Sequence, residues 1–209
     1  MGIVAFIYNR DEWSKRIRNR SDMSGYLIHL TKEYDGNTGM NNLIKILEDK
    51  TLYQSDPREG FIIGNQGAVC FQDVPVYGAS QNSFYEQNLR ELHTGMKVRY
   101  KPIGIAFRKE YVFNKGGRPV IYERKEKAKS FIPQEEWWRI VNFDLSNPDM
   151  IVDWTHEREW RHPGDFEFDL KEAFVLLTQH KTYGNFVNKV DQSIINGIGG
   201  ITVLDPVLS

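Results

Sequence analysis

The densest group of side chains that could do chemistry lies between residues 153 and 162. If this segment is a β-strand, Glu157, Glu159 and Arg161 share one face, because side chains alternate between the two faces of a strand. Two carboxylates on one face raise the pKa of one of them, while a nearby arginine favours the ionised form of the other. Such a pair could bind a sugar hydroxyl and orient a leaving group or a nucleophile. A solvated strand edge with cross-strand ion pairs would account for the same residues.

Two metal-binding interpretations of this segment have less support than the carboxylate pair. The His-Glu-x-x-His pattern of zinc proteases fails, because Trp160 stands where the second histidine is required. His156 and His162 could ligate a metal with Glu159, but this spacing is not diagnostic, and we expect no resident metal ion. A metal-dependent nuclease remains the leading enzyme alternative from the residues alone. Its Mg²⁺ ligands would be Asp153, Glu157 and Glu159, with Lys171 or Arg161 beside the phosphate.

A second candidate residue is His29, in the apolar segment 26–31, whose β-favouring residues predict a strand. A lone histidine in such a strand is most often a core residue, but Thr31 offers a hydroxyl on the same face. The single cysteine, Cys70, lies in the apolar run 68–71, which predicts a buried and unreactive thiol. A chain with one cysteine forms no internal disulfide, which suits a reducing cytoplasm.

The charge of the chain is divided between two neighbouring segments, although the net charge is only −1. Residues 97–129 contain eleven basic and three acidic residues, whereas residues 130–179 contain four basic and eleven acidic residues. A basic surface beside an acidic pocket would suit an anionic substrate, or the two segments pair with each other in the fold. No apolar run approaches the roughly 20 residues that span a bilayer, so we expect a cytoplasmic protein without a membrane partner.

The chain has 209 residues, of which 40% are hydrophobic and 26% charged, as in a globular domain. Strands and short helices are intermixed without the regular spacing of a doubly wound fold, which favours an α+β class with mostly antiparallel sheets. Residues 135–143 could form either a helix or a strand, and Asn41 or Asn42 could cap a short helix. We expect residues 1–22 to form an N-terminal extension or helical arm and residues 23–209 to form a single domain.

Four motifs occur in the order found in DarT-type ADP-ribosyltransferases and related AbiGi-like abortive-infection proteins, which the chain therefore resembles. The first is the His-x-Thr strand of residues 26–31, followed by a helix that ends at residues 46–50. The others are Cys-Phe-Gln-Asp-Val-Pro within residues 69–75, the glycine-rich block of residues 102–122, and Glu-Arg-Glu-Trp-Arg at residues 157–161. The resemblance extends from about Tyr26 to about Leu177.

This resemblance implies the split β-sandwich of ADP-ribosyltransferases, with peripheral helices and with NAD⁺ bound as a substrate between two sheets. It places Glu159 at the catalytic position, where the carboxylate would bind the 2′-hydroxyl of the nicotinamide ribose and stabilise an oxocarbenium-like state. Glu157 would orient the acceptor, and Arg161 would bind the diphosphate or hold Glu159.

The resemblance also implies a set of NAD⁺ contacts on other strands. His29 would contact the adenosine ribose or the nicotinamide region, with Thr31 supporting it. Phe71 or Tyr122 would stack on the nicotinamide ring. The basic segment 97–129 would be the place to look for the path of a nucleic-acid acceptor.

Three hypotheses about function follow. The first is an NAD-dependent ADP-ribosyltransferase of the defence or toxin type that acts on nucleic acid or protein, with an antitoxin or regulatory protein as a further partner. The second is a non-enzymatic nucleotide-binding or partner-binding module of the same fold in a phage-defence setting. The third is the metal-dependent nuclease.

Overall fold

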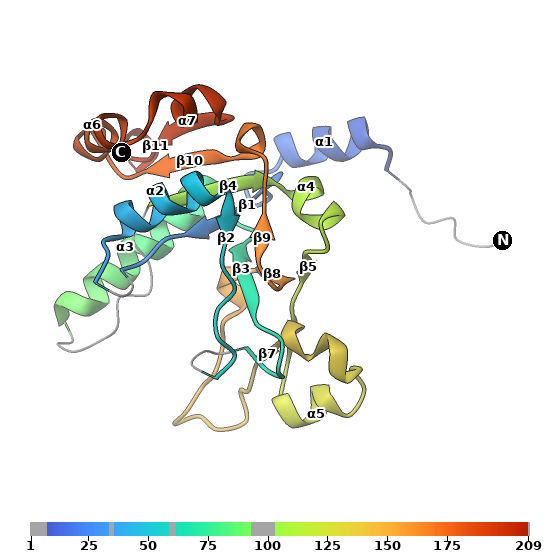
Figure 1. Ribbon diagram of the computed structural model, residues 1–209. Helices are drawn as coiled ribbons and strands as arrows, with labels where there is room; N and C mark the ends of the chain where they lie inside the picture. Colours follow the sequence, from blue (N-terminus) through green and yellow to red (C-terminus); the bar gives the residue numbers. More distant parts are fainter. Residues whose placement is uncertain (1–7, 34–35, 59–61, 93–102, 209) are drawn as a thin grey trace.

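The computed structural model describes residues 8–33, 36–58, 62–92 and 103–208. Seven strands form its central sheet: β1 (Tyr26–Leu30), β3 (Ala68–Gln72), β4 (Gly104–Arg108), β5 (Arg118–Pro119), β8 (Glu159–Pro163), β10 (Phe174–Leu177) and β11 (Gly200–Val203). Their order is β11-β10-β4-β1-β3-β8-β5 (Figure 1). All neighbouring pairs are antiparallel except β10 with β11. The predicted α+β class with mostly antiparallel strands is therefore confirmed.

Two small sheets and a set of peripheral helices complete the fold. The small sheets pair β2 (Thr51–Leu52) with β9 (Phe166–Glu167), and β6 (Ile121–Glu123) with β7 (Ile140–Asn142). The α-helices are α1 (Arg10–Arg18), α2 (Gly39–Asp49), α3 (Val76–Leu92), α4 (Lys109–Asn114), α5 (Lys125–Lys129), α6 (His180–Lys189), α7 (Gln192–Gly197) and α8 (Asp205–Leu208). The 3₁₀ helices are η1 (Gln134–Arg139), η2 (Thr155–Glu157) and η3 (Leu170–Glu172). In the part of the chain that the structure describes, no helix has the length and apolar character needed to cross a bilayer.

The central sheet divides between β1 and β3. Strand β1 pairs with β4 along its whole length, and β3 pairs with β8 along its whole length. Between β1 and β3, however, the register contains one pair, Ile28 with Gln72. We call β11, β10, β4 and β1 the β1 half, and β3, β8 and β5 the β8 half. In Figure 1, β10 and β4 lie across the upper part of the molecule, whereas β3, β8 and β5 run down toward α5 and β7.

The two faces of the sheet carry separate apolar cores. Phe71 and Phe107 belong to the larger core, which Leu43 and Leu47 of α2 and Phe166 of β9 complete. The other face carries a smaller core of Ile28, Val74, Ala79, Ala106, Leu176 and Leu204. Because paired residues of adjacent strands point to the same face, the register assigns every site residue on β1, β3 and β8 to one of these faces.

Local chemistry explains where the helices begin, and it corrects one prediction. Helix α2 starts after Thr38, whose side-chain oxygen accepts a hydrogen bond from the Asn41 N–H at 3.2 Å. The prediction that Asn41 or Asn42 caps this helix was therefore wrong by one turn. Helix α1 is capped by Asn9, which exchanges hydrogen bonds with Glu12 in a capping box. The ambiguous segment 135–143 forms both kinds of structure, since η1 is followed directly by β7.

Candidate functional site

Strand β8 carries the residues that the sequence singled out, but it begins later than expected. Glu157 is the last residue of η2, and Arg158 then adopts left-handed backbone angles, with φ 46° and ψ 51°. The strand starts only at Glu159. The expectation that Glu157 shares a strand face with Glu159 was therefore wrong, because the left-handed residue between them breaks the strand alternation. Glu159 and Arg161 do share a face, as expected.

Glu159 and Arg161 form a buried ion pair, with only 7% and 2% of their surfaces exposed. The Arg161 Nε donates to Glu159 Oε1 at 2.7 Å, and Nη2 donates to Oε2 at 3.3 Å. Burial alone would lower the pKa of Arg161, but the charge and hydrogen bonds of Glu159, together with contributions from Cys70, outweigh burial and raise the pKa above its usual value. The remaining nitrogen, Nη1, donates to the backbone carbonyls of Trp138 at 2.8 Å and Ile140 at 3.2 Å. Arg161 thus holds Glu159 and also ties β8 to η1 and β7.

Three further side chains surround this ion pair. In the β3–β8 register, Cys70 lies opposite Arg161 and Gln72 lies opposite Glu159, so both point to the face of the ion pair. The hydroxyl oxygen of Tyr122 accepts the Glu159 N–H at 2.8 Å, and burial raises the Tyr122 pKa to about 12. Burial, with a further contribution from the Glu159 charge, also raises the pKa of the Cys70 thiol, as expected for an unreactive cysteine. We call Cys70, Gln72, Tyr122, Glu159 and Arg161 the Glu159 cluster.

His29 lies on the opposite face of the sheet from Glu159. Ile28 pairs with Gln72, so the residues next to them, His29 and Phe71, both point to the other face. Their rings meet edge to face, with 6.0 Å between the ring centres. The His29 Nδ1 lies 2.8 Å from the carbonyl oxygen of Cys70. Burial lowers the pKa of His29, so the ring is neutral and Nδ1–H donates to that carbonyl. The ring thereby satisfies a β3 carbonyl just beyond the point where β1 and β3 stop pairing.

Thr31 and Phe71 lie inside the fold. Thr31 is 3% exposed, and its hydroxyl lies 3.0 Å from the carbonyl oxygens of both Gly39 and Ile103. Phe71 is 1% exposed and packs edge to face against Phe166 at 5.3 Å. Neither side chain presents a free surface. Of the residues for which the resemblance implied NAD⁺ contacts, the structure brings only Tyr122 next to Glu159.

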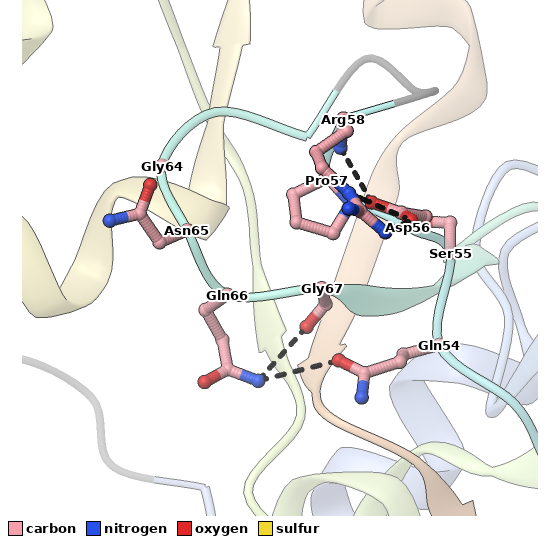
Figure 2. Close-up of a pocket in the computed structure, with 9 residues that line it drawn as sticks. All are labelled: Gln54, Ser55, Asp56, Pro57, Arg58, Gly64, Asn65, Gln66 and Gly67. Atoms are coloured by element: carbon pink, nitrogen blue, oxygen red, sulfur yellow. Dashed lines mark hydrogen bonds and ion pairs between the residues drawn. The ribbon is translucent and has the colours of Figure 1, made fainter.

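Two pockets in the described part of the chain lie at opposite ends of the β3–β8 ladder. The larger, of about 660 Å³, lies before β3, between residues 54–58 and residues 64–67, and Figure 2 shows these two segments facing each other. The smaller, of about 190 Å³, lies at the Gln72–Glu159 end of the ladder. Its lining combines Val74, Pro75, Tyr77, Gly78, Gln81 and Asn82 with Asp22, His156 and Arg158. Arg158, which lines the smaller pocket, directly precedes Glu159 in the chain.

The residues that the metal-binding alternatives would use as ligands form no metal site in the described part of the chain. Asp153 uses one carboxylate oxygen to accept the Thr155 N–H at 2.8 Å and the Thr155 hydroxyl at 2.6 Å, and Glu159 is paired with Arg161. Within residues 8–33, 36–58, 62–92 and 103–208, no three His, Cys, Asp or Glu side chains form a group that could hold a metal ion.

The predicted basic segment is described from residue 103 onward, and residues 97–102 lie outside the described part. Arg124, Lys125 and Lys127 are exposed on or beside α5, and Lys127 pairs with Glu123 at 3.3 Å. The Lys129 amine lies over the Trp137 ring, 4.4 Å from its centre. Trp137 belongs to η1, and the next residue of η1, Trp138, accepts a hydrogen bond from Arg161 through its carbonyl. The basic side chains on and beside α5 are therefore linked through η1 to the Glu159 cluster.

Comparisons with protein-family models, with curated proteins and with solved structures found no match. The geometry of the Glu159 cluster and the motifs in the sequence are therefore the basis for assigning a function.

Proposed function

We propose that this chain is an NAD⁺-dependent ADP-ribosyltransferase of the defence or toxin type, with Glu159 as its catalytic carboxylate. The observation that carries the proposal is the buried ion pair of Glu159 with Arg161 on β8. Arg161 fixes the carboxylate in one orientation, in surroundings where charges interact more strongly than in water. A carboxylate held in this way can stabilise the positive charge that develops on the ribose as nicotinamide leaves.

The hydrogen bonds of Glu159 leave room for a substrate hydroxyl. A carboxylate has about four lone-pair sites, and Arg161 uses one on each oxygen. The remaining sites can accept the 2′-hydroxyl of the nicotinamide ribose. In the reaction, the bond from ribose C1′ to the nicotinamide nitrogen breaks, and nicotinamide leaves with the electron pair. The acceptor nucleophile then bonds to C1′ and gives its proton to a base, for which Glu157 in η2 is our candidate.

The division of the sheet supports the finer fold assignment. A split β-sandwich needs two sheets that separate along one boundary, and the single pair between β1 and β3 is such a boundary. We propose that NAD⁺ binds between the β1 half and the β8 half, with the Tyr122 ring next to nicotinamide. In this proposal His29 sets the separation of the two halves through its bond to Cys70, and Thr31 and Phe71 support it from within the core.

The exposed cations on and beside α5 are the proposed contact for a macromolecular acceptor, which is nucleic acid or protein. Arg124, Lys125 and Lys127 lie in one short stretch of chain, and Arg161 holds the adjoining η1 by its hydrogen bond to Trp138. Cationic side chains of this kind attract phosphate backbones and acidic protein surfaces. An antitoxin or other regulatory protein could cover the same surface.

A non-enzymatic nucleotide-binding or partner-binding module of the same fold is the second candidate. The observation in its favour is that Glu159 is only 7% exposed and is bonded to Arg161 through both oxygens. A carboxylate held in this way could serve only to join β8 to η1 and β7.

Labelled NAD⁺ distinguishes the two candidates. Purified wild type, Glu159→Gln and a control, Glu167→Gln, are incubated with labelled NAD⁺ and cell lysate, and transferred label and released nicotinamide are measured. Glu167 is an exposed carboxylate on β9, so its loss leaves the Glu159 cluster intact. The proposal predicts transfer by wild type and Glu167→Gln and loss of transfer in Glu159→Gln. Tight NAD⁺ binding without transfer or nicotinamide release would favour the binding module.

A further inference from the structure

Gln72 is the residue at which the two halves of the sheet meet. It is the last residue of β3, and in the register it lies opposite Ile28 of β1 and opposite Glu159 of β8. Its side chain therefore points to the same face as the Glu159 carboxylate. Side chains in such a cross-strand position have Cβ atoms about 4.5–5.5 Å apart, so Gln72 and Glu159 occupy adjacent positions on this face.

The side-chain oxygen of Gln72 is a buried acceptor without a donor. Gln72 is 6% exposed, and its Oε1 has no hydrogen-bond partner among the residues that the structure describes. Leaving a buried polar atom unpaired costs free energy, and native proteins contain few such atoms. An apolar side chain would fit better beside Ile28 if this position served only for packing. The polar atom therefore points to a donor supplied by a ligand.

We propose that Gln72 is a substrate-binding residue, whose Oε1 accepts a hydrogen bond from the ribose hydroxyl adjacent to the one bound by Glu159. This inference rests on the proposed function. Two neighbouring acceptors match the two donors of a cis-diol, which the nicotinamide ribose presents at its 2′ and 3′ carbons. The smaller pocket lies at this end of the ladder, and Val74, two residues after Gln72, lines it. Arg158, which directly precedes Glu159 in the chain, lines the same pocket.

Gln72→Met keeps the shape of the side chain but removes the acceptor. The proposal predicts that this variant is more stable than wild type and binds NAD⁺ more weakly. Without NAD⁺, the variant no longer buries an unpaired oxygen, so its Tm rises by about 2–4 °C. With NAD⁺, the ribose hydroxyl loses its acceptor, so the dissociation constant rises about tenfold. A residue with a purely structural hydrogen bond would give a lower Tm when it is replaced.

The experiment measures the Tm and the NAD⁺ dissociation constant of wild type, Gln72→Met, Gln72→Leu and Gln134→Met. Gln134 is exposed at the start of η1 and serves as the matched control. A higher Tm together with weaker NAD⁺ binding in either Gln72 variant, and no change in the control, supports the assignment. A lower Tm in both Gln72 variants, or unchanged NAD⁺ binding, overturns it while the proposed function stands. A wild type that does not bind NAD⁺ overturns the proposed function and this assignment together.

Discussion

The ion pair between Glu159 and Arg161 makes a quantitative prediction about stability. Arg161→Met leaves the Glu159 carboxylate buried without its partner, and breaking a buried ion pair in this way costs about 3–5 kcal/mol. For a chain of 209 residues this corresponds to a fall in Tm of roughly 10 °C. Glu159→Leu leaves the guanidinium buried without its partner and is expected to cost a similar amount.

The double variant Glu159→Leu/Arg161→Met separates the ion pair from the rest of the site. Replacing both charges removes the unpaired charge, and what remains is the loss of donors to the Trp138 and Ile140 carbonyls. At about 1–2 kcal/mol for each carbonyl, the double variant should lose about 2–4 kcal/mol, well below the sum of the two single variants.

Urea unfolding followed by circular dichroism gives the free energy of unfolding of all four proteins. The matched control is the exposed pair Lys45 and Asp49, treated in the same way with Lys45→Met and Asp49→Leu, which should show little coupling. If the cost in the Glu159–Arg161 double variant equals the sum of the single variants, the two residues are not coupled. The account of the Glu159 cluster would then be refuted.

Three further predictions concern His29, Cys70 and the N-terminal cap of α2. Burial lowers the pKa of His29 in the folded chain. Below about pH 6.5 the unfolded chain therefore binds more protons than the folded chain, and the free energy of unfolding falls as the pH falls. His29→Gln should reduce this fall between pH 7.5 and 5 in urea titrations, whereas replacement of the exposed His180 should not. The raised pKa of the half-buried Cys70 thiol predicts that a disulfide reagent at pH 8 modifies it much faster in urea than in buffer, and equal rates would show that the fold does not protect the thiol. Thr38→Ala should destabilise the chain by about 1 kcal/mol, and a larger loss in Asn41→Ala would show that the cap is misplaced.

The strands were predictable from local sequence. The segments at residues 26–31, 67–71, 102–107 and 173–178 have the composition of strands, and they form β1, β3, β4 and β10 within two residues at each end. Each is rich in apolar or β-branched residues and is bounded by glycine, proline or a charged turn. Such local signals do not determine how strands pair, so the order of the sheet and its division between β1 and β3 came only from the structure.

The helix boundaries were less predictable where several residues could act as caps. Helix α3 starts at Val76, directly after Pro75, although the apolar spacing of residues 83–92 alone would place its start at residue 83. The proline was a usable signal, because proline is favoured at the beginning of a helix. Thr38 was overlooked as the cap of α2 because two asparagines, at residues 41 and 42, are equally good capping residues.

The candidate site was predictable in part. The shared face of Glu159 and Arg161 followed from strand alternation, and the structure added their bonds to each other and to η1 and β7. The position of Glu157 was missed because nothing in the sequence marks Arg158, which is not glycine, as left-handed. Gln72 was missed for a different reason. Glutamine is typical of the protein surface, so the sequence gives no sign that Gln72 is buried. It is buried because β3 pairs with a strand on each side.

The central claim is that the Glu159 carboxylate helps to break the bond between nicotinamide and ribose. The most direct measurement is the rate of nicotinamide release from NAD⁺, in the presence of lysate, by wild type and by Glu159→Gln after circular dichroism has shown that both are folded. The account predicts release by wild type and a fall of about a hundredfold or more in Glu159→Gln, as for other groups that stabilise developing charge. Equal rates of release by the two folded proteins would contradict it.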